Sequence, residues 1–150
     1  MEQLDKRDHK ILELLQKDGR MTVTELANSV GLSVTPCQIR MKRLEENGYI
    51  VGYTALVDHA KLNVNHVAFV QVTLNNTHTK ALREFNQAAR SIAEIEQCHM
   101  IAGNFDYLLK VRTSDITQFR LVLGEKISEL PHVQQSSSFV SMENVKDPGL

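Results

Sequence analysis

Long apolar runs are missing from this 150-residue sequence. No stretch approaches the roughly 18 consecutive apolar residues that a membrane-spanning helix needs, which argues against a membrane protein. The first seven residues, MEQLDKR, are mostly polar and lack the apolar core of a secretion signal. We therefore expect a protein of the cytoplasm.

Cysteine is scarce, and potential metal ligands do not cluster. The only two cysteines, Cys37 and Cys98, lie 61 residues apart. A structural disulfide between them is not expected in the cytoplasm, and two thiols alone are too few for a zinc site. The six histidines are scattered, with no pair at i, i+4 spacing. The sequence also pairs no nucleophile with a base. We expect no metal, no cofactor and no enzymatic activity.

An excess of charge of one sign is lacking as well. Seventeen Lys and Arg residues oppose eighteen Asp and Glu residues, so the formal net charge is −1. This balance excludes a uniformly basic nucleic-acid binder of the histone type. A local basic patch is still present, because residues 32–44 contain Arg40, Lys42 and Arg43 and no acidic residue.

Three helices are predicted in the first part of the chain. Apolar residues at helical spacing mark the first of them. The capping-box pattern TVTE, which begins at Thr22, opens the second helix, and Gly31 ends it. The third begins at Ser33 or Thr35 and ends at an Asn-Gly pair. Two helices joined by a short turn with glycine describe a helix-turn-helix, here at about residues 22–47.

The outward face of the third predicted helix has side chains that can contact DNA. Cys37, Met41 and Leu44 form an inward stripe, and the opposite side is polar and basic. That outward side consists of Gln38, Ile39, Lys42 and Arg43, with Arg40 on the flank. Glutamine pairs with adenine, lysine and arginine bind guanine or phosphate, and isoleucine contacts the thymine methyl group. An ordinary solvated helix that happens to be basic is the alternative. The expected DNA contacts are Ser33, Thr35, Gln38, Ile39, Arg40, Lys42 and Arg43.

The next segment changes character. Residues 49–57 are rich in β-forming side chains and predict a small wing or an extended arm. Residues 58–65 are polar and are expected to form a linker. The sequence is thus divided into a winged helix-turn-helix domain at 1–57, the linker, and a second domain at 66–150.

The second half alternates strands and helices. The patterns predict strands at 66–74, 95–102, 105–113 and 133–145, and helices at 80–92 and 116–130. The order β-α-β-β-α-β is that of a ferredoxin-like domain, so the predicted fold class is α+β. Such a sheet carries helices on one face only, and no part of the chain remains to cover the other. We therefore expect the sheets of two subunits to pair in a dimer.

Four stretches stand in register along the chain: LDKRDHKILELLQKDGR, GLSVTPCQIRMKRLEENGYIVGYTALVD, AGNFDYLLKV and FVSMENVK. They resemble the Lrp/AsnC, or feast/famine, family of bacterial and archaeal transcriptional regulators. Together with their spacing they extend the resemblance over essentially the whole chain. The resemblance implies a winged helix-turn-helix followed by a ferredoxin-like regulatory domain. It also implies dimers, often assembled into octamers, and an amino acid or related metabolite bound between regulatory domains.

The resemblance also identifies an effector-binding loop. The family's glycine–acid–aromatic–Asp–Tyr pattern falls on residues 103–107, so the implied effector-binding residues are Gly103, Asn104, Asp106 and Tyr107. The acid of the family pattern is Asn104 here, which removes one charge where an effector's ammonium would sit. Asp106 has a plain alternative, because aspartate commonly caps a loop.

The main hypothesis is a sequence-specific DNA-binding transcriptional regulator that responds to an amino acid or a related metabolite. Its expected partners are double-stranded DNA, this effector, and further copies of the chain as a homodimer or octamer, with no membrane. One alternative is an architectural, nucleoid-type protein that wraps DNA without responding to a metabolite. A small enzyme on the same fold is the other alternative.

Overall fold

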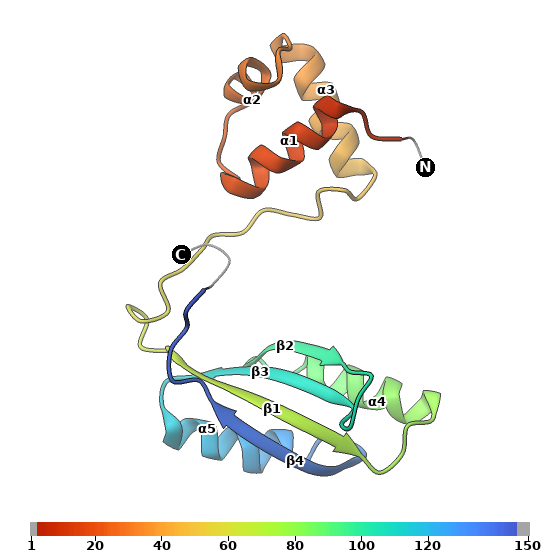
Figure 1. Cartoon of the computed structure of the whole chain (residues 1–150), viewed down its shortest axis with the longest axis vertical. Coiled ribbons are helices and arrows are strands. Elements are labelled where there is room, and N and C mark those ends of the chain that lie inside the picture. The colour runs from red at the N-terminus through yellow and green to blue at the C-terminus, as the bar shows by residue number, and fades with distance from the viewer. Residues whose placement is uncertain (1–2, 147–150) are drawn as a thin grey trace. The chain divides into compact units, whose positions relative to one another are not determined.

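The computed structural model describes residues 3–146 and divides the chain into two compact units. The first unit ends at Leu56 and the second begins at Val57. Figure 1 shows three helices in the first unit, and a twisted sheet with helices in the second. Each unit has its own hydrophobic core. No helix in the described part of the chain is long and apolar enough to cross a membrane.

The first unit is a three-helix domain. Its helices are α1 (Lys6–Lys17), α2 (Val23–Val30) and α3 (Val34–Glu46). Their shared core consists of Ile11, Leu26, Ala27, Cys37 and Leu44, all essentially without solvent exposure. The inward stripe expected for the third helix therefore contributes to this core through Cys37 and Leu44.

The segment after α3 forms an extended arm and no strand. Residues 51–58 lack regular secondary structure, and a turn follows at residues 59–63. A β-rich segment needs a neighbouring strand for its backbone hydrogen bonds, and the first unit offers none among its described residues. Of the two expected alternatives, the arm is therefore the one observed. Apolar side chains on it, including Val51 and Leu56, are exposed.

The second unit is a four-stranded antiparallel sheet with helices on one face. Its elements are β1 (His66–Leu74), α4 (Thr79–Arg90), β2 (Ile95–Met100), β3 (Tyr107–Thr113), α5 (Ile116–Val122), a π-helical turn (Leu123–Ile127) and β4 (Val133–Val140). The strand order is β2-β3-β1-β4, and every neighbouring pair is antiparallel. This is the ferredoxin-like arrangement expected from the order of elements, and the α+β fold class is confirmed.

Alternation along the strands separates a core face from an open face. On β1, Ala68, Val70 and Val72 are buried against the helices, together with Phe85 of α4 and Phe119 of α5. The residues between them face the other side of the sheet. Figure 1 shows α4 and α5 on the same side.

Several boundaries in the second unit differ from the sequence expectation. β2 ends at Met100 and β3 begins at Tyr107, so a loop of residues 101–106 separates them. The last strand ends at Val140 instead of continuing to residue 145, because its partner β1 pairs no further than Ala68. The helix expected at residues 116–130 is α5, and it changes to a π-helical turn after Val122. This change alters the hydrogen-bond spacing within its last turns.

Candidate DNA interface and effector site

Both ends of α2 are fixed locally, the first by a capping box and the second by a glycine. The Thr22 hydroxyl accepts from the Glu25 N–H at 3.3 Å, and the Glu25 carboxylate accepts from the Thr22 N–H at 2.7 Å. Gly31 ends α2 with a φ of 67°, a left-handed conformation that glycine adopts without steric cost. Ser33 is the N-cap of α3, although its side chain makes no capping hydrogen bond. The sequence predicted this capping box and this glycine correctly.

One face of α3 is open to solvent. Its exposed members include Ser33, Thr35, Gln38, Ile39 and Lys42. The Ile39 side chain is 64% exposed, which is unusual for isoleucine on a helix packed against its neighbours. Lys42 makes only a loose ion pair with Glu46, at 3.6 Å between exposed groups. This face therefore combines amide, hydroxyl, ammonium and methyl groups that can approach a major groove.

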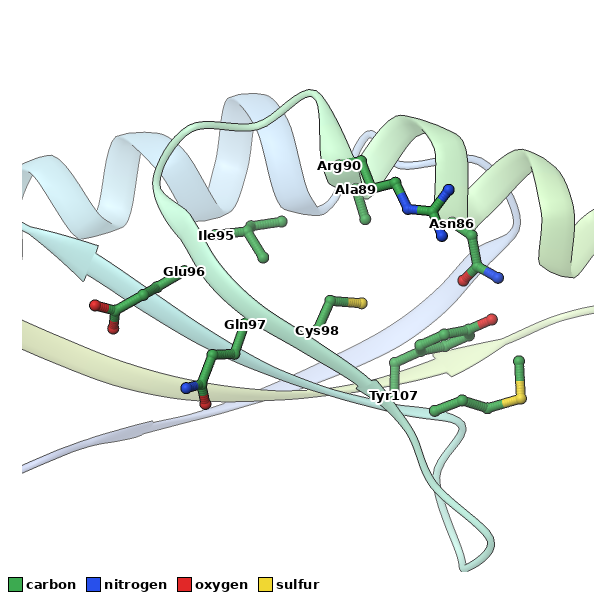
Figure 2. Close-up of a pocket in the computed structure, with 9 residues that line it drawn as sticks. Asn86, Ala89, Arg90, Ile95, Glu96, Gln97, Cys98 and Tyr107 are labelled. Carbon is green, nitrogen blue, oxygen red and sulfur yellow. The ribbon is translucent and has the colours of Figure 1, made fainter. Parts of the chain in front are cut away.

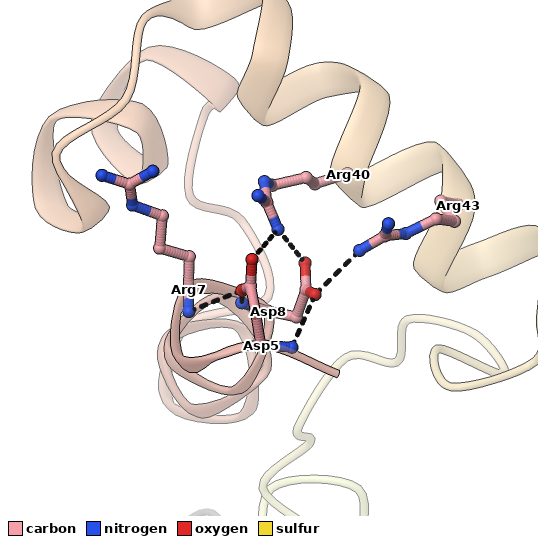
Figure 3. Close-up of polar contacts among 5 residues, drawn as sticks. All are labelled: Asp5, Arg7, Asp8, Arg40 and Arg43. Carbon is pink, nitrogen blue, oxygen red and sulfur yellow. Dashed lines mark hydrogen bonds and ion pairs between the residues drawn. The ribbon is translucent and has the colours of Figure 1, made fainter. Parts of the chain in front are cut away.

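Arg40 and Arg43 do not belong to this open face. Figure 3 shows both guanidinium groups turned towards the start of α1. Arg40 Nη1 lies 2.7 Å from Asp5 Oδ2 and 2.8 Å from Asp8 Oδ1. Arg43 Nη2 lies 2.8 Å from Asp8 Oδ2. The expected outward projection of Arg43 is therefore wrong, because a long side chain can reach sideways to a carboxylate on another helix.

The carboxylates that hold these arginines also cap α1. Asp5 Oδ1 accepts from the backbone N–H groups of Arg7 and Asp8, at 2.8 and 2.9 Å. The Asp8 carboxylate accepts in return from the Asp5 N–H at 3.0 Å, and Asp8 is fully buried. The Asp8 backbone N–H, followed by the Arg40 guanidinium, lowers the pKa of Asp5 to about 2. The hydrogen bond to Asp8, followed by that to Asp5, raises the pKa of Arg40. These contacts join α3 to the start of α1 and fix the orientation of its exposed face.

The loop implied to bind an effector is closed by Asp106. The Asp106 carboxylate accepts from the Leu74 N–H at 2.7 Å. Its own N–H donates to the Val72 carbonyl at 2.9 Å, and its carbonyl accepts from the Ile101 N–H at 2.8 Å. Asp106 thus joins the loop to the end of β1, which is the loop-capping role considered as its alternative. Gly103 and Asn104 are exposed at the loop itself.

Tyr107 points away from that loop and into the helix side of the sheet. Its ring packs on Phe85 with 4.2 Å between ring centroids, and the residue is 1% exposed. Burial raises the pKa of the Tyr107 phenol, and the nearby Asn86 side chain lowers it in part. The phenol oxygen is buried and has no hydrogen-bond partner among the residues that the structure describes. Of the four implied effector residues, Tyr107 alone therefore faces the helices.

An open cavity of about 450 Å³ lies between α4 and β2. Figure 2 shows it with Tyr107 on one side. Its lining consists of Asn86, Ala89, Arg90, Ile95, Glu96, Gln97, Cys98, Met100 and Tyr107. Asn86 and Arg90 were not predicted from the sequence. Their i, i+4 spacing places two polar side chains on one edge of α4, which was the available signal.

Comparisons with known proteins cover both units. The family model of the Lrp/AsnC ligand binding domain matches residues 67–150, and a winged helix-turn-helix DNA-binding model matches residues 4–51. A proline dehydrogenase transcriptional activator of Rhizobium radiobacter is 59% identical over 98% of this chain and 94% of its own length. The leucine-responsive regulatory protein of Escherichia coli strain K12 is 46% identical over 95% and 87%. A transcriptional regulator of Neisseria meningitidis, solved in complex with L-Met, matches with a TM-score of 0.90 and 32% identity, covering 97% of this chain and 94% of that one.

Proposed function

Because this chain belongs to the Lrp/AsnC family of transcriptional regulators, we propose that it controls transcription by binding DNA in response to an amino acid. The observation that carries the proposal is the exposed face of α3, which presents Gln38, Ile39 and Lys42 while Asp8 holds the helix in place. A regulator of this kind needs no catalytic group. The enzyme alternative is therefore set aside in favour of DNA binding.

The proposed DNA contacts separate into two kinds. Gln38 and Ile39 read base edges in the major groove, and Lys42 contacts guanine or phosphate. Ser33 and Thr35, at the start of the helix, donate hydroxyl groups to phosphate. Arg40 and Arg43 act mainly by positioning α3 through their ion pairs with Asp8. Two such helices in a dimer imply an operator that is an imperfect palindrome.

The open face of the sheet supports association with a second copy. Phe69 of β1 and Phe139 of β4 are opposite each other on this face and are 36% and 54% exposed. Large apolar side chains in this position are characteristic of an interface. We therefore propose a homodimer with paired sheets, and an octamer as the higher assembly. Avidity from several DNA-binding units then offsets the weak non-specific attraction of a chain with net charge −1.

The loop at residues 103–107 remains the proposed effector site at an interface between subunits. Gly103 and Asn104 are exposed there and can contact a bound amino acid. Asp106 holds the loop against β1, so it orients the site while one of its oxygens stays engaged with the Leu74 N–H. Tyr107, whose ring packs on Phe85, anchors the end of the loop from the helix side of the sheet. The effector alters DNA binding only by its difference in affinity for alternative assemblies.

The most specific part of the proposal concerns the target. The relative from Rhizobium radiobacter bears the name of a proline dehydrogenase activator, and it matches nearly the full length of this chain. We extend that role to this chain and name proline as the first effector to test. Since its target is chromosomal DNA, we place the protein in the cytoplasm.

A gel shift tests this proposal. The probe is the DNA upstream of the proline dehydrogenase gene of the same genome, with a scrambled duplex of equal composition as the control. We expect a shift of the probe at protein concentrations that leave the scrambled duplex free, and a change in that shift when proline or the pool of twenty amino acids is added. A shift that no amino acid alters favours the architectural alternative. No shift even at low salt, where electrostatic binding is strongest, contradicts the proposal.

A further inference from the structure

The cavity between α4 and β2 has a chemistry of its own. It is formed where the last turn of α4 passes over the edge strand β2, and its walls include the apolar side chains Ala89, Ile95 and Met100. A volume of about 450 Å³ is within the range of small-molecule sites. Of the loop at residues 103–107, only Tyr107 belongs to its lining. The cavity is therefore distinct from the exposed loop.

One cation in this cavity has no counter-charge. Arg90 makes no ion pair with any residue that the structure describes, and it lies close enough to Cys98 to influence the pKa of that thiol. The cavity's acid, Glu96, is already bound by Lys110 at 2.9 Å and by Arg112 at 3.2 Å. Figure 2 shows the Glu96 carboxylate directed away from Arg90. The charge offered to a ligand is thus positive.

Hydrogen-bonding groups converge near the same cation. The Tyr107 hydroxyl is buried and finds no hydrogen-bond partner within residues 3–146, although the rest of the residue is well packed. A buried polar group left in this state destabilises the fold unless a ligand or water completes it. Figure 2 shows the polar ends of Asn86, Arg90 and Tyr107 on one side of the cavity. A molecule that reaches the buried hydroxyl must displace a lining side chain slightly.

We propose that this cavity is a second small-molecule site, which binds a small monocarboxylate with a short apolar chain, such as a 2-oxo acid. The carboxylate pairs with Arg90, and the 2-oxo oxygen accepts from the Asn86 amide and the Tyr107 hydroxyl. The apolar chain lies against Ile95 and Met100. No free acid is available for an ammonium group, so the site discriminates against α-amino acids. The regulator thereby senses the deaminated carbon skeleton apart from the amino acid itself.

Calorimetry on the full-length protein without DNA tests the site, with 4-methyl-2-oxopentanoate as the probe. We expect binding that Arg90→Gln weakens at least tenfold, since a charge-assisted pair is lost. Tyr107→Phe retains the ring contact with Phe85 and should weaken binding several-fold. Arg120→Gln, a change at an exposed arginine of α5, is the matched control and should leave binding unaltered. Leucine, which has the same chain and carries an ammonium group, should bind at least tenfold more weakly.

Alkylation of Cys98 provides an independent readout. Cys98 lines the cavity, whereas Cys37 is buried in the other unit, so a thiol reagent distinguishes them. The 2-oxo acid should slow alkylation of Cys98, and Arg90→Gln should abolish that protection. Absence of binding at millimolar probe, equal binding of leucine, or insensitivity to Arg90→Gln would overturn the proposal. Because no DNA is present, these results are separate from the gel shift, and either proposal can fail alone.

Discussion

Replacing Asp8 with asparagine should destabilise the first unit far more than the loss of an exposed charge does. The Asp8 carboxylate is fully buried and receives the guanidinium groups of Arg40 and Arg43, each at 2.8 Å, and the Asp5 N–H at 3.0 Å. Asp8→Asn removes the charge, keeps the shape, and leaves two partly buried cations with weaker partners.

The size of the expected loss in stability follows from how deeply Asp8, Arg40 and Arg43 are buried. Breaking a buried ion pair by removing one partner costs about 3–5 kcal/mol. The side chains of Arg40 and Arg43 are 23% and 33% exposed, and water can partly solvate them once they are released. We therefore expect a loss of about 2–4 kcal/mol in the free energy of unfolding of the first unit. For a unit that ends at Leu56 this is a large share of its stability.

Pulsed alkylation of Cys37 in urea measures the stability of the first unit, which contains Asp8. Cys37 is completely buried in the core of the helices, and its modification reports the unfolding of that core alone. The midpoint for Asp8→Asn should shift to clearly lower urea. Glu13→Gln is the matched control, because Glu13 forms only exposed ion pairs with Lys10 and Lys17. Equal shifts for the two variants would refute the reasoning that burial makes the Asp8 contacts strong.

Three further predictions follow from other contacts. Lys42→Gln should weaken binding to all DNA sequences and reduce the slope of log K against log salt by about one if Lys42 touches phosphate, which a salt titration measures. The pKa of Asp5 is lowered from 3.8 to about 2, so its contribution to stability is complete above pH 4 and is lost as the pH falls towards 2. Melting curves of wild type and Asp5→Asn should therefore differ at pH 5 and converge at pH 2; a constant difference would contradict this. Phe139→Glu places a charge on the open sheet face and should shift the sedimentation of the protein towards the monomer, whereas an unchanged assembly would exclude that face as the interface.

The elements of the fold were predictable from the sequence because local signals define them. Capping residues and glycine located the ends of α2, and period-two alternation located β1 and β3. The two arginines of α3 were not predictable in the same way. A helical wheel gives the direction of Cβ, but it contains no information about Asp8, which lies more than thirty residues earlier.

The candidate sites show the same limit. The effector loop was identified from consecutive residues, yet the role of Asp106 depends on the N–H of Leu74, thirty-two residues away in the sequence. The cavity joins Asn86 and Arg90 of α4 with Tyr107 of β3, and only the packing of the helix on the sheet brings them together. Sequence patterns therefore predicted the fold better than they predicted contacts between elements.

The central claim is that the exposed face of α3 reads DNA sequence while its arginines hold the helix in position. Fluorescence anisotropy with the operator and with an unrelated duplex tests it most directly, by comparing wild type with Gln38→Ala. Gln16→Ala, at an exposed glutamine of α1, is the control. We predict that Gln38→Ala lowers the ratio of operator to unrelated affinity by about tenfold or more, with little change for the unrelated duplex. An unchanged ratio would contradict the assignment of this face as the reading surface.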